Sequence, residues 1–333
     1  AEGKSAANLD EIRKRINEID ERLQGLISDR ARFAQQVGVA KGDLVSAVDY
    51  YRPEREAEVL RAVVERNEGG PLRDEEMLRL FREIMSACLA QQEPLKIGLL
   101  GPEGTFTQTA VFKHFGHSVR ALPFHTIDEV FQEVDCGAAD FGVVPIENST
   151  EGSVNNTLDM FLTSPLKIAG EIELRIEQHL LGKMTGLEKI ERICAHEQSL
   201  AQCRGWLREY LPHVELIGMS SNAAGARRAR DEEGTAAIGP DVAADVYDLK
   251  VLVSGIEDRA DNSTRFLVVG RELLAASGND KTTLLVSTSD TGGGAGVLHN
   301  LLKPLAEHGA VSYTHLRAHE TYLLISYAVF CLK

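Results

Sequence analysis

Two polar runs, each next to an apolar segment, carry side chains that could hold and protonate a small molecule. The first, residues 147–150 (Glu-Asn-Ser-Thr), follows the apolar run 141–146, and the second, residues 261–265 (Asp-Asn-Ser-Thr-Arg), opens the apolar run 266–269. A short apolar run bounded by turn formers predicts a buried strand, and ligands in open α/β sheets bind just beyond the ends of strands. We therefore predict that the two polar runs meet at one cleft. A capped loop is the alternative, because Asn and Ser also favour turns.

Two further candidates are long side chains that fall on apolar helix faces in the N-terminal part of the chain. Apolar residues recur at steps of three and four over residues 9–40, which predicts one long helix that needs a partner along its length. Arg30 falls on this stripe, and Gln92 ends the stripe of a helix predicted over 77–92, after another that begins at Pro53. Buried polar groups need partners, and a ligand can be the partner. The alternative for Arg30 is that its head reaches water or pairs with an acid.

The helical pattern of about residues 5–95 resembles the all-helical chorismate mutases. The resemblance rests on Leu9-x-x-Ile12-Arg13-x-x-Ile16-x-x-Ile19-Asp20, Asp29-Arg30, Val37-Gly38-x-Ala40-Lys41, Arg55-Glu56 and Gln91-Gln92. In that family three helices per chain interlock as a homodimer, and each site borrows an arginine from the partner. The resemblance implies that the carboxylates of chorismate are held by Arg13 of the partner subunit and by Arg30, the ether oxygen by Lys41 and Gln92, and the ring hydroxyl by Glu56, with Arg55 in support.

The chemistry expected of such a site needs no nucleophile. The rearrangement of chorismate is pericyclic, so the site must hold a compact conformer, and donors near the ether oxygen stabilise the negative charge that builds as the C–O bond stretches. Two positions depart from the family pattern: Arg52 stands where some members carry a second acid, and Cys88 where some carry serine. The activity is still expected, with the affinity for chorismate left open.

The next segment predicts a strand followed by a helix, without a nucleotide-binding motif. Residues 96–100 predict the strand, and the glycine-containing run 101–105 leads into the helix. The spacing is neither GxGxxG nor a P-loop, so what remains is a helix N-terminus that attracts a carboxylate. Cys194 and His196 are only weakly indicated as a nucleophile pair, because no third group that would orient the pair is evident, and we expect Cys194 to be a structural core residue.

Three separated motifs in this region are similar to those of prephenate dehydratase. They are Gly101-Pro102-x-Gly104-Thr105-Phe106, Pro145-Ile146-Glu147-Asn148-Ser149 and Asn262-x-Thr264-Arg265-Phe266, and the resemblance covers about residues 96–272. The family fold has two α/β lobes with the site in the cleft between them, like a periplasmic binding protein. The resemblance implies that Thr264 is the acid that helps the ring hydroxyl leave as water while carbon dioxide departs. It implies substrate binding by Glu147, Asn148, Ser149, Arg265 and Phe266, with Thr105 and Gln202 on the rim of the cleft.

Dehydratase chemistry makes demands on the surroundings of Thr264. Aromatisation drives the loss of water and carbon dioxide together, but a threonine is a poor acid in water, so the site must be dry and rich in donors. Arg265 is expected to bind a substrate carboxylate. The alternative is a strand arginine that pairs with a surface acid such as Asp258.

The last part of the chain begins like an ACT regulatory domain and then departs from that pattern. Residues 281–287 predict a strand, and 294–309 a loop and a helix. In dehydratases this module binds phenylalanine, and one half of that site is matched by Gly296, Val297, Leu298 and His299. The other half, a Glu-Ser-Arg-Pro motif, is expected soon after residue 309 and does not follow. We hypothesise that the tail from about residue 310 is foreign or out of frame and that the ACT domain is truncated, which resequencing the coding DNA would test.

Composition and charge limit the other classes of function. The formal net charge of −14 over 333 residues argues against a nucleic-acid binder. The five cysteines show no paired spacing, so we expect a reducing compartment and no zinc site. No secretory signal is visible, and no run reaches the ~18 consecutive apolar residues of a membrane span. We expect a cytoplasmic protein that needs no metal or redox cofactor.

Together the patterns and the family resemblances imply a multidomain chain with an all-α chorismate mutase domain, a two-lobed α/β dehydratase domain that is periplasmic-binding-protein-like, and a partial α+β ACT domain. The expected boundaries are 1–94, 95–272 and 280–333. The predicted function is a bifunctional enzyme of phenylalanine biosynthesis, which acts on chorismate and prephenate as a homodimer or higher oligomer with phenylalanine as an effector. Two alternatives remain: a non-catalytic sensor of amino acids or small anions, and a mutase with an inactive dehydratase lobe. Following chorismate loss and phenylpyruvate formation separates them, because prephenate accumulates in the last case.

Overall fold

The chain divides into two compact units. The computed structural model describes residues 2–41, 51–150, 152–276, 278, 280–287, 299–300, 303–304, 307–308, 312–319 and 324–332. The helical unit comprises Ala1–Leu95 together with Lys113–Arg120, and the α/β unit comprises Lys96–Phe112 and Ala121–Lys333. The sequence placed Lys113–Arg120 in the α/β domain, whereas the contacts of this segment place it with the helices.

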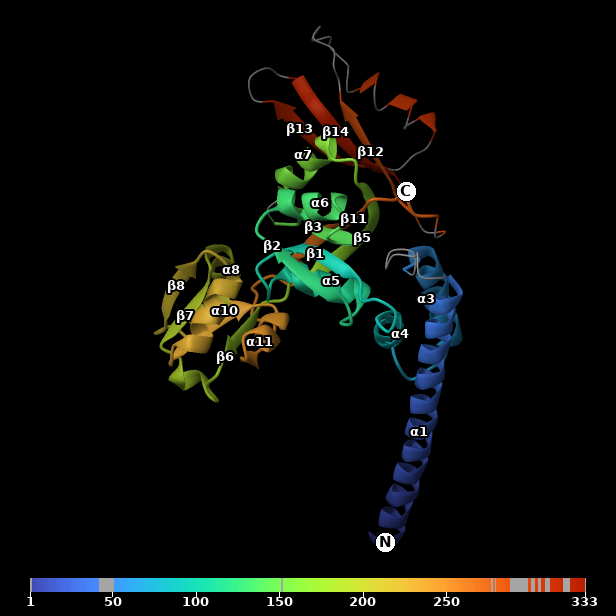
Figure 1. Cartoon of the computed structure of the whole chain (residues 1–333). Coiled ribbons are helices and arrows are strands. Elements are labelled where there is room, and N and C mark those ends of the chain that lie inside the picture. Colours follow the sequence, from blue (N-terminus) through green and yellow to red (C-terminus); the bar gives the residue numbers. More distant parts are fainter. Residues whose placement is uncertain are drawn as a thin grey trace. The chain divides into compact units, whose positions relative to one another are not determined.

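The long helices of the helical unit are those that the apolar periodicity predicts. They are α1 (Glu2–Lys41), α3 (Pro53–Arg66) and α4 (Asp74–Leu89). α3 begins with a proline, whose missing N–H has no role at that position, and it carries Glu54 and Glu56 in its first turn, where acids stabilise a helix N-terminus. α4 packs against α1 and α3 (Figure 1), and the contact buries Val63 and Cys88. Of the helices in the described ranges, none is long and apolar enough to cross a membrane.

The apolar stripe of α1 is uncovered in a single chain. Leu9, Ile16 and Leu26 are 47%, 51% and 64% exposed, although an amphipathic helix buries such a stripe against a partner. Phe33 and Val37 continue the stripe with 64% and 51% of their surface exposed. A contiguous apolar surface of this kind marks an interaction site.

The first lobe of the α/β unit is a mixed sheet with the strand order β2-β1-β3-β11-β5, to which β4 adds by pairing with β3. The strands are β1 (Lys96–Leu100), β2 (Arg120–Phe124), β3 (Phe141–Asn148), β4 (Gly152–Ser153), β5 (Lys167–Arg175) and β11 (Ser263–Gly270). β1 and β3 are parallel, whereas β11 runs antiparallel to both β3 and β5. The helices are α5 (Phe106–Phe115), α6 (Ile127–Asp135) and α7 (Asn155–Thr163). α6 and α7 lie against the sheet (Figure 1) and bury Val130, Phe131 and Leu158 in one core with Val144.

The second lobe is a sheet with the strand order β10-β6-β9-β7-β8. Its strands are β6 (His179–Gly182), β7 (Arg192–His196), β8 (Glu215–Met219), β9 (Thr235–Gly239) and β10 (Lys250–Val253). Its helices are η1 (Leu187–Lys189), α8 (Glu197–Gln202), α9 (Arg204–Tyr210), α10 (Asn222–Asp231) and α11 (Val242–Val246). α10 approaches β7 so closely that a Cβ added at Gly225 would lie 2.2 Å from the carbonyl oxygen of Cys194. Small residues therefore set the distance between this helix and the sheet.

The chain crosses between the lobes twice, which confirms the predicted two-lobed arrangement. It leaves the first lobe after β5 and returns in β11, which lies between β3 and β5. The crossing segments are hydrogen-bonded to each other: the Ile176 N–H donates to the Asn262 carbonyl oxygen at 2.9 Å, and the Ile256 N–H donates to the Gln178 carbonyl oxygen at 2.9 Å. Because β11 sits in the middle of its sheet, the polar residues at its start lie beside those at the end of β3.

The C-terminal part contains a separate antiparallel sheet with the order β12-β14-β13. The strands are β12 (Thr282–Ser287), β13 (Ser312–His319) and β14 (Leu324–Leu332). The strand predicted over 281–287 is confirmed by β12. Of the predicted phenylalanine half-site, Gly296, Val297 and Leu298 lie outside the described residues, and His299 is helical and exposed.

Candidate functional site

The two lobes of the α/β unit enclose a cavity of about 330 Å³, a usual size for a small-molecule site. The first lobe supplies Thr105, Phe106, Thr107, Pro145, Asn148, Val154, Thr264 and Phe266. The second lobe and the crossing segments supply Ile176, Gln178, His196, Gln198, Ser199, Gln202, Ser220, Ser221, Asn222, Pro240 and Asn262. The predicted site residues that line this cavity are Thr105, Asn148, Gln202, Thr264 and Phe266.

Thr264 and Asn148 form the centre of the cavity wall in the first lobe. They are direct partners in the register of β11 and β3, and the Asn148 Nδ2 donates to the Thr264 Oγ1 at 2.8 Å. The same amide also donates to the Asn262 Oδ1 at 3.1 Å, which fixes its orientation. Thr264 is only 9% exposed. Because its oxygen accepts from the amide, its hydroxyl hydrogen is left for an acceptor in the cavity.

The N-termini of two helices, α5 and α10, border the cavity. Among the lining residues within the described ranges there is no lysine or arginine. Residues 105–107 lie at the start of α5 and residues 220–222 at the start of α10, where Ser221 caps the helix by accepting from the Ala224 N–H at 3.0 Å. Helix N-termini carry partial positive charge and unpaired N–H groups, so the cavity is suited to a carboxylate.

A polar network in the second lobe faces these groups. Gln178, which is 1% exposed, donates through Nε2 to the Gln202 Oε1 at 3.0 Å and to the Ser199 Oγ at 3.2 Å. The Asn222 Nδ2 donates to the same Ser199 oxygen at 2.8 Å. The sequence predicted only Gln202 of this group. The other three follow or precede strands, as ligand-binding residues do, but nothing in the sequence shows that these strand ends meet.

Arg265, Glu147 and Ser149, which were predicted to bind the substrate, are not among the residues that line this cavity. The Arg265 Nη1 lies 2.7 Å from the Glu147 Oε2 and its Nε lies 3.2 Å from the Glu171 Oε1. Burial acts to lower the pKa of Arg265, but these carboxylates raise it above its ordinary value. Successive side chains of a strand point to opposite faces, so Thr264 faces the cavity and Arg265 faces away. The Ser149 Oγ instead accepts from the Ser263 N–H at 3.0 Å and closes the turn.

Arg265 pairs with Glu147 and Glu171, and not with Asp258, the surface acid that the sequence suggested as an alternative partner. Asp258 caps α9 by accepting from the N–H groups of Gly205 and Trp206 at 2.8 and 3.0 Å. Glu171 instead holds Arg265 and, through the same oxygen, the Lys281 Nζ at 2.8 Å. Burial acts to raise the pKa of Glu171, but these two cations hold it below its ordinary value.

The residues predicted to bind chorismate are spread over the helical unit of a single chain. Arg13 is exposed, with its Nη1 3.8 Å from the Asp10 Oδ1. Arg30 is half-buried on α1. Arg55 is exposed and pairs with Glu58 at 2.6 Å, so it does not support a cluster around Glu56 in this chain. Lys41 ends α1, and its side chain lies outside the described residues.

Gln92 contacts α1 as its place on the stripe suggests. Its Nε2 donates to the Ala34 carbonyl oxygen at 2.5 Å, and its side chain lies against Gly38, where an added Cβ would be 3.2 Å from the amide carbon. Its Oε1 is buried and has no hydrogen-bond partner among the described residues. One amide N–H and the amide oxygen therefore remain for another group.

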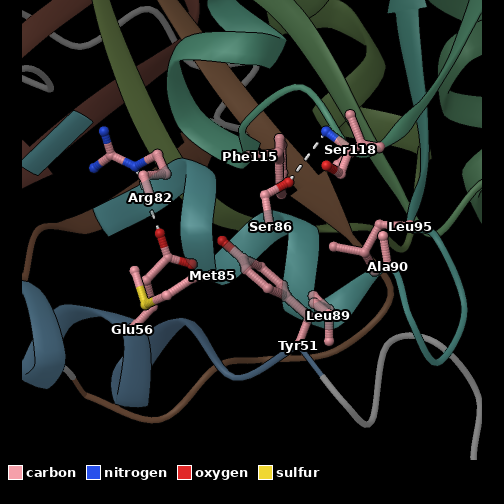
Figure 2. Close-up of a pocket in the computed structure, with 11 residues that line it drawn as sticks. Tyr51, Glu56, Arg82, Met85, Ser86, Leu89, Ala90, Leu95, Phe115 and Ser118 are labelled. Atoms are coloured by element: carbon pink, nitrogen blue, oxygen red, sulfur yellow. Dashed lines mark hydrogen bonds and ion pairs between the residues drawn. The ribbon is translucent and has the colours of Figure 1, made fainter. Parts of the chain in front are cut away.

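Glu56 lies in a second, much smaller cavity of about 40 Å³. Figure 2 shows its carboxylate directed at Arg82, whose Nε lies 3.5 Å from the Glu56 Oε1. The Tyr51 hydroxyl hydrogen-bonds the same carboxylate. Burial raises the pKa of Glu56, and Arg82 and Tyr51 oppose that rise. The sequence did not single out Tyr51 or Arg82.

The suggested nucleophile pair has no support in the geometry. Cys194 is buried in β7, and burial raises the pKa of its thiol. His196 acts as the N-cap of α8, where its Nδ1 accepts from the Gln198 N–H at 3.4 Å. Since a reactive cysteine needs a lowered pKa, the interpretation as a core cysteine holds. Within the described ranges no cluster of His, Cys, Asp and Glu could hold a metal ion.

Two family models match the chain, one over most of the helical unit and the other over much of the α/β unit. The chorismate mutase type II model matches residues 12–93, and the prephenate dehydratase model matches residues 97–273. A bifunctional chorismate mutase/prephenate dehydratase from Stutzerimonas stutzeri is 52% identical over 308 residues, which cover 91% of this chain and 83% of that protein. The protein of the same description from Aquifex aeolicus is 40% identical over 304 residues, covering 90% of this chain and 83% of its own length.

Solved structures are similar to the α/β part. A prephenate dehydratase from Arthrobacter aurescens in complex with L-Phe has a TM-score of 0.64 at 32% identity, covering 71% of this chain and 80% of that one. The quorum-quenching acylase GqqA has a TM-score of 0.62 at 24% identity, covering 71% of this chain and 86% of its own. The second similarity is one of fold alone.

Proposed function

The chain belongs to the bifunctional chorismate mutase/prephenate dehydratase family, and from this premise we propose which of its residues perform the two reactions. It is an enzyme of phenylalanine biosynthesis that rearranges chorismate to prephenate and converts prephenate to phenylpyruvate. The similarity to the bifunctional relatives does not favour a non-catalytic sensor or an inactive dehydratase lobe. The cavity between the lobes is assigned to prephenate, and the helical unit to chorismate.

In the dehydratase step, Thr264 delivers a proton to the ring hydroxyl of prephenate. The C–C bond to the ring carboxylate breaks and its electron pair enters the ring, the C–O bond to the hydroxyl breaks, and carbon dioxide and water leave as the ring becomes aromatic. The observation that carries this assignment is the 2.8 Å hydrogen bond from the Asn148 amide to the Thr264 Oγ1. That donor stabilises the charge left on the threonine oxygen, which then regains its proton from water.

The carboxylates of prephenate are bound by the N-termini of α5 and α10 rather than by Arg265. This proposal is supported by the engagement of Arg265 with two glutamates and by the position of residues 105–107 and 220–222 in the cavity lining. Oriented N–H groups in a cleft closed from water bind an anion strongly. Phe266 supplies an apolar surface for the ring, and Gln202 is held in place by Gln178.

The test of this site is a pair of substitutions at one position. Thr264→Val keeps the shape of the side chain and removes the proton, so it should lower dehydratase turnover by about 10²–10⁴-fold, the usual worth of a general acid. Thr264→Ser keeps the hydroxyl and should retain most of the activity. In both variants the loss of chorismate should proceed as before, with prephenate accumulating in the first. Full phenylpyruvate formation by Thr264→Val would rule out the assignment.

In the mutase step, Arg30, Lys41 and Gln92 of one chain act with Arg13 of the partner subunit. The two arginines bind the carboxylates of chorismate, Lys41 and the remaining N–H of Gln92 donate to the ether oxygen, and Glu56 accepts from the ring hydroxyl. The proposal is supported by the buried amide of Gln92, whose oxygen has no partner among the described residues. It is also supported by the exposed stripe of α1, because a homodimer that buries this stripe can bring Arg13 of the partner subunit to the site.

A mixing experiment tests the shared site and the homodimer together. Arg13→Ala and Arg30→Ala should each abolish mutase turnover as pure proteins. If each site uses its own Arg30 and the partner's Arg13, one of the two sites in a mixed dimer is intact, so random exchange should restore about a quarter of the wild-type rate. No recovery after verified subunit exchange would exclude the shared site. Both single variants should keep full dehydratase turnover, which serves as the control for folding.

The remaining proposals concern regulation and location. We infer that the C-terminal part is a partial ACT module whose half-site, with His299, takes phenylalanine, supported by the relative from Arthrobacter aurescens described in complex with L-Phe. Calorimetric titration with phenylalanine tests this, and the absence of binding heat at millimolar phenylalanine would refute it. We also place the enzyme in the cytoplasm, which fractionation of cells that express it would check.

A further inference from the structure

Glu56 is surrounded by polar groups that it would not need simply to accept a hydrogen bond. Its cavity in the helical unit is lined by Tyr51 ahead of α3, by residues of α4 and by residues of Lys113–Arg120. Figure 2 shows Arg82 and Tyr51 approaching Glu56 from different elements. The Arg82 Nε is buried and makes an ion pair of 3.5 Å with the Glu56 Oε1, and the Tyr51 hydroxyl hydrogen-bonds the same carboxylate. The carboxylate therefore keeps lone pairs for another donor.

The segment Lys113–Arg120 closes this cavity, although it lies within the range of the dehydratase model. The ring of Phe115 packs on that of Tyr51 with 5.5 Å between centroids. The Ser118 N–H donates to the Ser86 Oγ at 3.3 Å, an interaction drawn in Figure 2. Gly116, with φ +76°, fits so closely that an added Cβ would lie 2.5 Å from the Ser86 Cβ. The segment therefore forms one wall of the cavity that holds Glu56.

We propose that Arg82 and Tyr51 are positioning residues of the mutase reaction, which hold the Glu56 carboxylate ionised and in one orientation inside a wall completed by Phe115. The proposal rests on the role proposed above for Glu56. An ionised carboxylate accepts a stronger hydrogen bond from the ring hydroxyl of chorismate than a neutral carboxyl group does. A buried carboxylate beside a substrate that carries two negative charges needs a fixed cation to stay ionised.

Among the charged groups around Glu56, Arg82 is the one that keeps the carboxylate ionised. Burial is the main cause that raises the pKa of Glu56, and the charge of Arg82 is the main cause that lowers it. Tyr51 stays protonated and donates, because burial and the nearby Glu56 raise its pKa. His114 on α5 is neutral at neutral pH, because burial and Arg82 lower its pKa to about 4. Glu54 acts on Tyr51 and is itself paired with an arginine at 2.8 Å.

The test is the pH profile of kcat/KM for chorismate. In Arg82→Gln the acid limb of the profile, where Glu56 takes up its proton, should move to higher pH by about one to three units, the usual effect of losing an adjacent cation. At higher pH the activity should return toward that of the wild type. Arg82→Lys keeps the charge and should restore most of the profile. Arg79→Gln, an exposed position on the same helix, is the matched control and should leave the profile unchanged.

Several outcomes would overturn the inference. A loss of mutase activity that is the same at every pH would mean that Arg82 acts only in folding, and an unmoved acid limb would mean that it does not control Glu56. Tyr51→Phe keeps the proposal testable if Arg82→Gln does not fold, because it should move the limb in the same direction by a smaller amount. Glu56→Gln separates the two proposals. Wild-type mutase turnover in that variant would refute the role of Glu56, whereas its inactivity together with a normal Arg82→Gln profile would refute only this inference.

Discussion

His114 makes the stability of the helical unit depend on pH in a way that one substitution can remove. The ring lies in the last turn of α5 against Phe115, with 4.6 Å between centroids and an interplanar angle of 79°. Burial, and after it the charge of Arg82, lowers the pKa of His114 from 6.5 to about 4. Protonating the folded protein therefore costs free energy that protonating the unfolded chain does not.

The sign and the size follow from this shift. Between pH 6.5 and 4 the unfolded chain binds a proton on this residue and the folded protein does not, so the free energy of unfolding falls as the pH falls through this range. Full stability is present above pH 6.5. At 1.36 kcal/mol per pKa unit, the loss approaches about 3 kcal/mol near pH 4. His114→Gln cannot be protonated, so this part of the loss should disappear in the variant.

The assay must follow the helical unit alone, because two units need not unfold together. We suggest urea unfolding at several pH values, with pulses of hydrogen exchange at one fixed pH and mass spectrometry of peptides from α4. The slope of unfolding free energy against pH is compared, so that a different starting stability of the variant does not matter. His213→Gln, at an exposed position, is the control and should keep the slope of the wild type. Parallel slopes for wild type and His114→Gln would refute the reasoning.

Four further substitutions test the packing and the charges of the α/β unit. Gly225→Ala places a Cβ 2.2 Å from a carbonyl oxygen of β7, so it should destabilise the second lobe by about 3 kcal/mol or more, measured by the fluorescence of Trp206 in urea. Asp258→Ala removes the cap of α9 and should cost about 1 kcal/mol in the same measurement, and no change would mean that the cap is replaced by water. Arg265→Met and Glu171→Gln should each lower the stability, with a coupling of about 1–3 kcal/mol in a double-mutant cycle. Additive effects would show that the pair does not interact.

Much of the architecture follows from local patterns. The three-and-four spacing of apolar residues is enough to predict α1, and short apolar runs between turn formers are enough to predict β1 and β3. The meeting of Asn148 and Thr264, which are 116 residues apart, was also predicted, because polar residues at the ends of buried strands gather at one edge of a sheet. The motifs that resemble known families support these patterns with their order along the chain.

The sequence did not predict how the side chains at the sites are oriented. Arg265 and Thr264 are neighbours, and both are suited to a site for a carboxylated substrate, but only one of them can face the cavity. Gln178 and Arg82 cannot be told from other polar residues in the sequence, because their partners lie in other segments of the chain. The segment Lys113–Arg120 continues a helix of the α/β pattern, and nothing local indicates that it packs on α4.

Amino-acid types and their spacing thus determined which segments become helices and strands, and which donors and acids are available at their ends. The side chains of successive residues in a strand point to opposite faces of the sheet, because that alternation is a property of the extended backbone. Which of the two faces meets the second lobe depends on pairing between distant segments, and a shift of one residue in the register would exchange Thr264 for Arg265. Only the tertiary structure decides that choice, since the buried area and hydrogen bonds that select one register exist only when β3, β5 and β11 are already side by side.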